Sequence, residues 1–76
     1  MEYLTNSFYG NKVNKSAYIE PYYSDEDVKK CVNKLNKWLA KYDQQDVKVD
    51  AFKIDTELVD IAQYATVLTI VYHHEN

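Results

Sequence analysis

The sequence has little of several residue types that usually carry covalent or metal chemistry. Its 76 residues include one cysteine, one glycine, one proline and no arginine. A single cysteine excludes a disulfide and a cysteine-based zinc site within one chain. Arginine is the preferred residue for gripping phosphate or guanine, and the net charge is −3, so the composition argues against a nucleic-acid binder.

The sequence also predicts no targeting segment. The N-terminus has neither the basic start nor the apolar run of a signal peptide, and no apolar stretch approaches the ~20 residues that span a bilayer. We therefore expect a cytoplasmic protein that does not bind membranes. Many Lys, Asn, Tyr and Ile residues without Arg are typical of AT-rich genes, which points to a low-GC bacterium or one of its phages.

The pattern near the C-terminus predicts assembly, because residues 64–72 read YATVLTIVY. Alternate side chains of a strand point to opposite sides, and here both sides carry apolar or aromatic residues. One helix is available to cover one side, so we expect a second subunit or a ligand to cover the other. A domain of 76 residues without a disulfide also gains stability most readily by forming a homo-oligomer.

A long helix is predicted over residues 24–42. Ser24 is a suitable N-cap, and three acids follow it in the first turn, where the helix dipole favours them. Apolar residues recur every three or four positions, and lysines occupy much of the remaining surface, which we interpret as solvent-exposed. The apolar stripe consists of Val28, Cys31, Val32, Leu35, Trp38, Leu39 and Tyr42.

Three strands are predicted around this helix. The first covers residues 16–23 and the last runs from Tyr64 to His73. The second covers residues 47–55, and its alternation changes phase at Ala51, which a bulge or burial of both faces would explain. A wider loop or a long hairpin, with Asp60 near its turn, links the second strand to the last.

These elements predict one domain of class α+β with the order β-α-β-β. We expect a three-stranded antiparallel-type sheet that is packed on or wrapped around one long helix, over residues 17–76. Residues 1–16 are polar with scattered aromatics and are expected to form an N-terminal arm or a small hairpin that turns at Gly10-Asn11.

Few residues are candidates for catalysis or metal binding. Cys31 lies on the apolar stripe, where burial makes a thiol inert. His73 and His74 are adjacent in a strand, so their rings point to opposite faces and do not chelate one ion within a chain. The acids around the second strand lack the turn glycine of a calcium loop. We therefore expect no enzyme, no cofactor and no metal.

Tyrosine is abundant for a chain of this length, with eight copies. Its large apolar ring and polar tip suit subunit interfaces and stacking sites, although half-buried strand tyrosines are also ordinary. We interpret the aromatic side chains of the sheet and helix as a ligand or interface surface. The residues predicted for it are Tyr18, Tyr22, Tyr64, Tyr72, Phe52 and Trp38.

The order of elements over residues 17–74, with Tyr64-Ala65-Thr66-Val67 and Val71 in the last strand, resembles the dodecins. Dodecins are small flavin-binding proteins in which a sheet wraps a helix and many copies form a hollow shell. The chain is also similar to short sporulation-associated and phage proteins of low-GC bacteria. Dodecins stack flavin on a tryptophan of the second strand and use a glutamine after the tyrosine, whereas this chain has Trp38 on the helix and Ala65 after Tyr64. The resemblance therefore implies a dodecin-like oligomer without flavin storage.

Two functions follow from these observations. The first is a non-enzymatic small oligomer that sequesters a small, nucleotide-like ligand through its aromatic sheet face. The alternative is a phage or mobile-element inhibitor that binds and blocks a host defence protein, for example by adding an edge strand.

Overall fold

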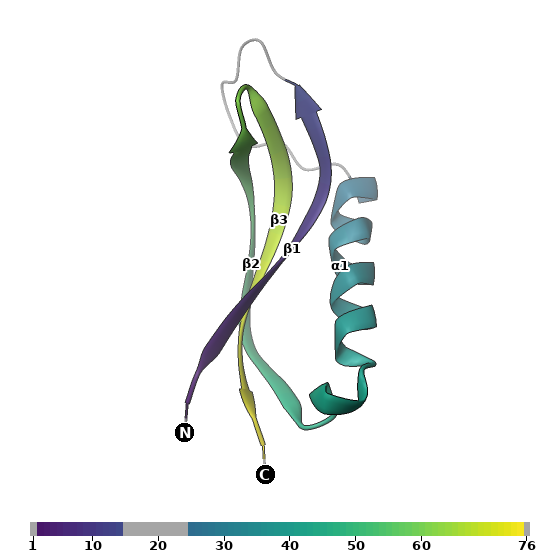
Figure 1. Cartoon of the computed structure of the whole chain (residues 1–76), viewed down its shortest axis with the longest axis vertical. Coiled ribbons are helices and arrows are strands. Elements are labelled where there is room, and N and C mark those ends of the chain that lie inside the picture. Colours follow the sequence, from purple (N-terminus) through teal and green to yellow (C-terminus); the bar gives the residue numbers. More distant parts are fainter. Residues whose placement is uncertain (1, 15–24, 76) are drawn as a thin grey trace.

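Strands dominate the protein, and the C-terminal strand lies in the middle of the sheet (Figure 1). The computed structural model describes residues 2–14 and 25–75. In chain order the elements are β1 (Leu4–Asn14), α1 (Asp25–Leu39), the 3-10 helix η1 (Tyr42–Gln44), β2 (Val47–Asp60) and β3 (Gln63–His74). The strands pair antiparallel in the order β1-β3-β2.

The expected sheet wrapped around a long helix, with a dodecin-like architecture, is wrong. The helix α1 has 15 residues, which span roughly 22 Å at 1.5 Å per residue. The strand β2 has 14 residues, which span roughly 46 Å. One short helix lies along one side of a long sheet (Figure 1), and α1 ends at Leu39, so that Tyr42 falls in η1 and is exposed.

The N-terminal segment also differs from its prediction. Residues 4–14 form β1, a full edge strand paired with β3, where an arm or a small hairpin was expected. The Gly10-Asn11 pair makes a bulge instead of a turn, because the pairing register shifts between Tyr9 and Lys12. The strand expected at residues 16–23 lies outside the described residues.

The β2–β3 hairpin agrees with the alternation of side chains predicted from the sequence. The register shifts between Val49 and Ala51, which confirms the bulge, one of the two explanations offered for the change of phase. The bulge brings Val49 and Phe52 to the same face of the sheet, opposite Tyr72 and Ile70 of β3. The chain turns immediately after Asp60, so the link between β2 and β3 is the long hairpin and not the wider loop.

The core lies between α1 and the β1–β3 half of the sheet. It consists of the buried residues Phe8, Cys31, Leu68 and Ile70, with Leu35, Trp38, Ile54 and Tyr72 packed against them. On the other side of β3, Ala65 and Val67 are each 1% exposed. The single chain therefore buries side chains on both faces of β3.

The helix is attached to β1 by polar contacts at the bulge. The ammonium of Lys34 donates to the main-chain carbonyl of Tyr9 at 2.6 Å, and that of Lys30 donates to Oδ1 of Asn11 at 2.8 Å. A Cβ on Gly10 would lie 3.3 Å from the carbonyl oxygen of Asp27, so glycine permits this close approach. Two lysines that were interpreted as solvent-exposed thus fix the helix to the sheet.

Candidate interaction surface

The helix covers only part of its side of the sheet, which we call the helix face. Its substantial contacts are with β1 and β3, and β2 extends beyond it. Four side chains of β2 on the helix face are nevertheless apolar, and Thr56 lies between the last two of them. They are Val49, Phe52, Ile54 and Leu58, here called the β2 apolar row. Val49 is 37% exposed, Phe52 69% and Leu58 62%. An apolar row of this kind normally lies against another layer.

A groove runs between α1 and the β2 apolar row. Val32 and Leu35 of α1 form one wall, Val49, Phe52 and Ile54 form the other, and Leu68 and Ile70 of β3 form the floor. Its volume is about 220 Å³, and the described residues that line it are all apolar. This α1–β2 groove has no polar group to orient a reaction, so its chemistry is the burial of apolar side chains.

The residues predicted to form one aromatic surface lie in different environments. The rings of Trp38 and Tyr72 pack edge to face with centroids 4.9 Å apart, and Trp38 also contacts Phe8 at 5.8 Å. These two predicted site residues therefore stabilise the core. Phe52 lies in the α1–β2 groove and is exposed.

Tyr64 lies apart from Trp38 and Tyr72. Tyr64 is partly buried on the helix face of β3, eight positions from Tyr72, so roughly 26 Å of strand separates the two. Tyr18 and Tyr22 lie outside the described residues. Val32, Val49, Ile54 and Leu58 were missed as surface residues. The alternation of apolar and charged residues along β2 is a signal that could have found the last three, and the apolar stripe of α1 contains Val32.

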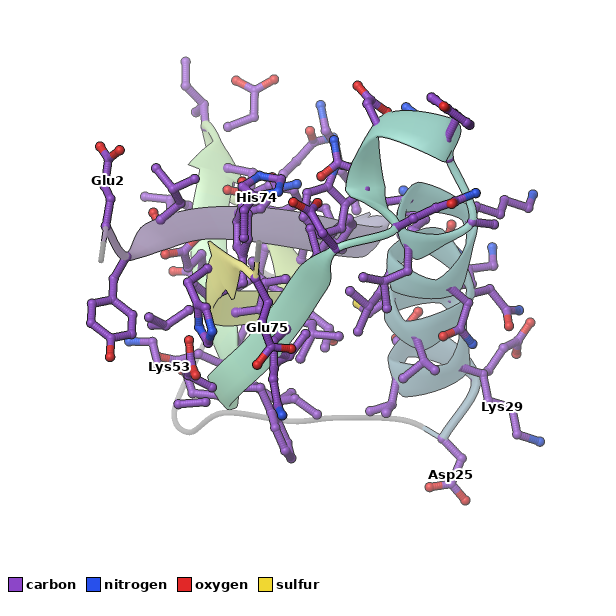
Figure 2. All side chains as sticks on the ribbon, turned by 90° about the horizontal axis from the view of Figure 1, so that it is seen from below. Glu2, Asp25, Lys29, Lys53, His74 and Glu75 are labelled. Atoms are coloured by element: carbon purple, nitrogen blue, oxygen red, sulfur yellow. The ribbon has the colours of Figure 1, made fainter. Side chains whose placement is uncertain are left out.

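The opposite side of the sheet, here called the far face, is polar at its edges. The register places Lys53, Asp55 and Glu57 of β2 on it, and Ser7 Oγ lies 3.1 Å from Thr69 Oγ1 across it. Figure 2 shows Lys53 away from α1. A cleft of about 480 Å³ lies toward the hairpin end, with Tyr9, Lys12, Glu57 and Ala65 in its lining. This volume falls in the range of small-molecule sites.

Two histidine–aspartate pairs join the end of β3 to the start of β2. Nδ1 of His73 lies 2.7 Å from Oδ2 of Asp50, and Nδ1 of His74 lies 2.7 Å from Oδ1 of Asp46. The two rings lie on opposite faces of the sheet. The hydrogen bond from His74 is the main reason that the pKa of Asp46 lies below its usual value.

The cysteine offers no catalytic centre. Cys31 is fully buried, and its thiol donates to the carbonyl of Thr66 at 3.5 Å. Burial raises the pKa of the Cys31 thiol, which disfavours the reactive thiolate. Within residues 2–14 and 25–75, no three His, Cys, Asp or Glu side chains gather in a way that would hold a metal ion.

Comparison with protein-family models, curated proteins and solved structures found no match. Among the described residues, no helix is long and apolar enough to cross a membrane. The geometry of the chain is therefore the basis for its function, and above all the β2 apolar row, which the helix leaves partly exposed.

Proposed function

We propose that this chain is a non-enzymatic binding protein that works in the cytoplasm as a homo-oligomer. Its assembly surface is the α1–β2 groove together with the β2 apolar row. The observation that carries the proposal is the exposure of Phe52 and Leu58, 69% and 62%, on a strand whose other face is charged.

The energy available from this surface supports assembly. Burying a side chain such as Phe or Leu contributes about 1.5–3 kcal/mol, and one copy leaves several such side chains on the β2 apolar row uncovered. A domain of 76 residues has a small core, so this burial is large relative to its own stability. A second copy would thus stabilise each fold and remove an aggregation hazard.

Native mass spectrometry combined with light scattering tests the proposal. The wild type is expected to form an oligomer at micromolar concentration, and Phe52→Ser with Leu58→Ser is expected to reduce it to a monomer. Ile61→Ser is the matched control, because Ile61 is 91% exposed in the hairpin turn and does not belong to the β2 apolar row. A folded wild type that stays monomeric at high micromolar concentration would contradict homo-oligomeric assembly.

The same experiment bears on the other two predictions. A bound small-molecule mass would support sequestration of a ligand, for which the far-face cleft beside Tyr9 and Lys12 has the volume. A folded monomer would favour the alternative of a phage or mobile-element inhibitor, in which a host protein covers the β2 apolar row.

A further inference from the structure

The far-face cleft lies where the central strand of the sheet has its smallest side chain. Ala65 of β3 pairs with Lys12 of β1 on one side and with Glu57 of β2 on the other, so these three residues form one row across the far face. Tyr9, which pairs with Val67, lines the cleft further along β1. A methyl group between two long side chains leaves room for the cleft, whose volume is about 480 Å³.

The two long side chains of this row have opposite charges. Lys12 and Glu57 are both exposed, and in the described part of the chain neither charge is paired with another side chain. Their Cα atoms lie two strand spacings apart, which is about 10 Å. The other described residues that line the cleft carry no charge. A molecule in the cleft therefore meets an ammonium group at one wall and a carboxylate at the other.

We propose that the far-face cleft binds a small zwitterion, such as an ω-amino acid. The anionic group of the ligand pairs with Lys12, and its ammonium group pairs with Glu57. The apolar chain between the two groups lies over the row and against the ring of Tyr9, which is 39% exposed. A simple anion or a simple cation would pair with only one of the two walls, so the cleft selects a ligand that has both charges.

This site lies on the face of the sheet opposite the α1–β2 groove. The inference therefore goes beyond the proposed homo-oligomer and does not depend on it. A ligand in the cleft and a second copy on the β2 apolar row occupy different surfaces of the same chain.

Probes of equal chain length test the requirement for both charges. The probe ε-aminocaproate has both charges, caproate has only the anion, and hexylamine has only the cation. Gly10 is the only glycine of the chain and lines the cleft, so its amide signal in a nuclear magnetic resonance titration reports occupancy. We expect ε-aminocaproate to shift this signal saturably at millimolar concentration, and the other two probes to bind at least about tenfold more weakly. No saturable shift, or equal affinity for all probes, would overturn the proposal.

Variants of the two walls test which residues recognise the two charges. Lys12→Gln and Glu57→Gln are each expected to weaken binding of ε-aminocaproate at least about tenfold, because each removes the partner of one end. The double variant Lys12→Glu/Glu57→Lys keeps both charges, and the zwitterion can bind to it in the reverse direction. We therefore expect the double variant to recover most of the wild-type affinity, and a double variant as weak as the single ones would overturn recognition of both ends.

Lys53→Gln is the matched control for these variants. Lys53 also lies on the far face but does not line this cleft, so the same change in net charge is expected to leave the affinity unchanged. Circular dichroism of every variant verifies folding. Adenosine monophosphate is the comparison ligand, and tighter binding of it at Gly10 would replace the zwitterion by a nucleotide and overturn the proposed ligand class.

Light scattering on the same samples separates this site from the proposed assembly. A monomeric wild type that shows the saturable shift would contradict the homo-oligomer and support the zwitterion site. An oligomeric wild type without the shift would overturn the zwitterion site and leave the proposed function intact.

Discussion

At the residue scale, the Asp46–His74 hydrogen bond makes the stability of the fold depend on pH. The hydrogen bond from His74 lowers the pKa of Asp46 in the folded protein below its usual value. A lowered folded-state pKa contributes stability above the unfolded-state pKa, and this contribution is lost as pH falls through the folded-state value. The pair therefore stabilises the start of β2 against the end of β3 in mildly acidic and neutral solution, and it weakens in acid.

The variant Asp46→Asn isolates this effect. The wild type is expected to have the higher free energy of unfolding at about pH 5, and the difference is expected to shrink as the pH falls through about 4 toward about 2. Urea unfolding at a series of pH values measures it. Asp43→Asn is the control, because Asp43 is an exposed acid in the neighbouring η1. A difference that stayed constant down to pH 2 would show that the carboxylate charge of Asp46 contributes nothing to stability.

At the element scale, the β2–β3 turn carries a strained residue. Ala62 has φ of 54°, in the left-handed region that side chains with a Cβ disfavour. Ala62→Gly is therefore expected to raise the free energy of unfolding by about 0.5–1 kcal/mol, measured by urea unfolding. Ala51→Gly, in the extended backbone of β2, is the matched control and is expected to lower it. A loss of stability in Ala62→Gly would mean that the turn gains more from the alanine side chain than it loses in strain.

The elements also show what the sequence can predict. The α1 stripe was predictable because its apolar residues recur every three or four positions. The β2 bulge and the hairpin at Asp60 were each one of two alternatives that the local pattern allowed. The strand β1 was not predictable. On its helix face the apolar residues Leu4 and Phe8 alternate with Asn6 and Gly10, and this weakens the period-two pattern of a strand. The central position of β3 depends on how all three strands pair, which no local pattern shows. The local pattern likewise does not show which strand the helix leaves exposed.

At the scale of the whole molecule, the mismatch between one short helix and a long sheet explains the candidate surface. The molecule extends 47 Å along its longest axis, whereas α1 spans roughly 22 Å. The helix therefore covers the β1–β3 half over part of its length, and in the β2 apolar row it leaves Phe52 and Leu58 largely exposed. A chain with a longer helix or a second one would cover this row internally, so the short helix is what favours assembly.

If folding is coupled to the proposed assembly, stability is expected to depend on protein concentration. If the folded unit is a dimer and the unfolded chain is a monomer, each tenfold rise in concentration adds about 1.4 kcal/mol per dimer to the apparent free energy of unfolding. The wild-type thermal midpoint, measured by circular dichroism between low and high micromolar concentration, is therefore expected to rise. Phe52→Ser exposes a hydroxyl in place of the largest side chain of the β2 apolar row, so its midpoint is expected to be lower and nearly independent of concentration. A wild-type midpoint that did not change over a hundredfold range would mean that each copy folds alone, with the β2 apolar row left open to a different partner.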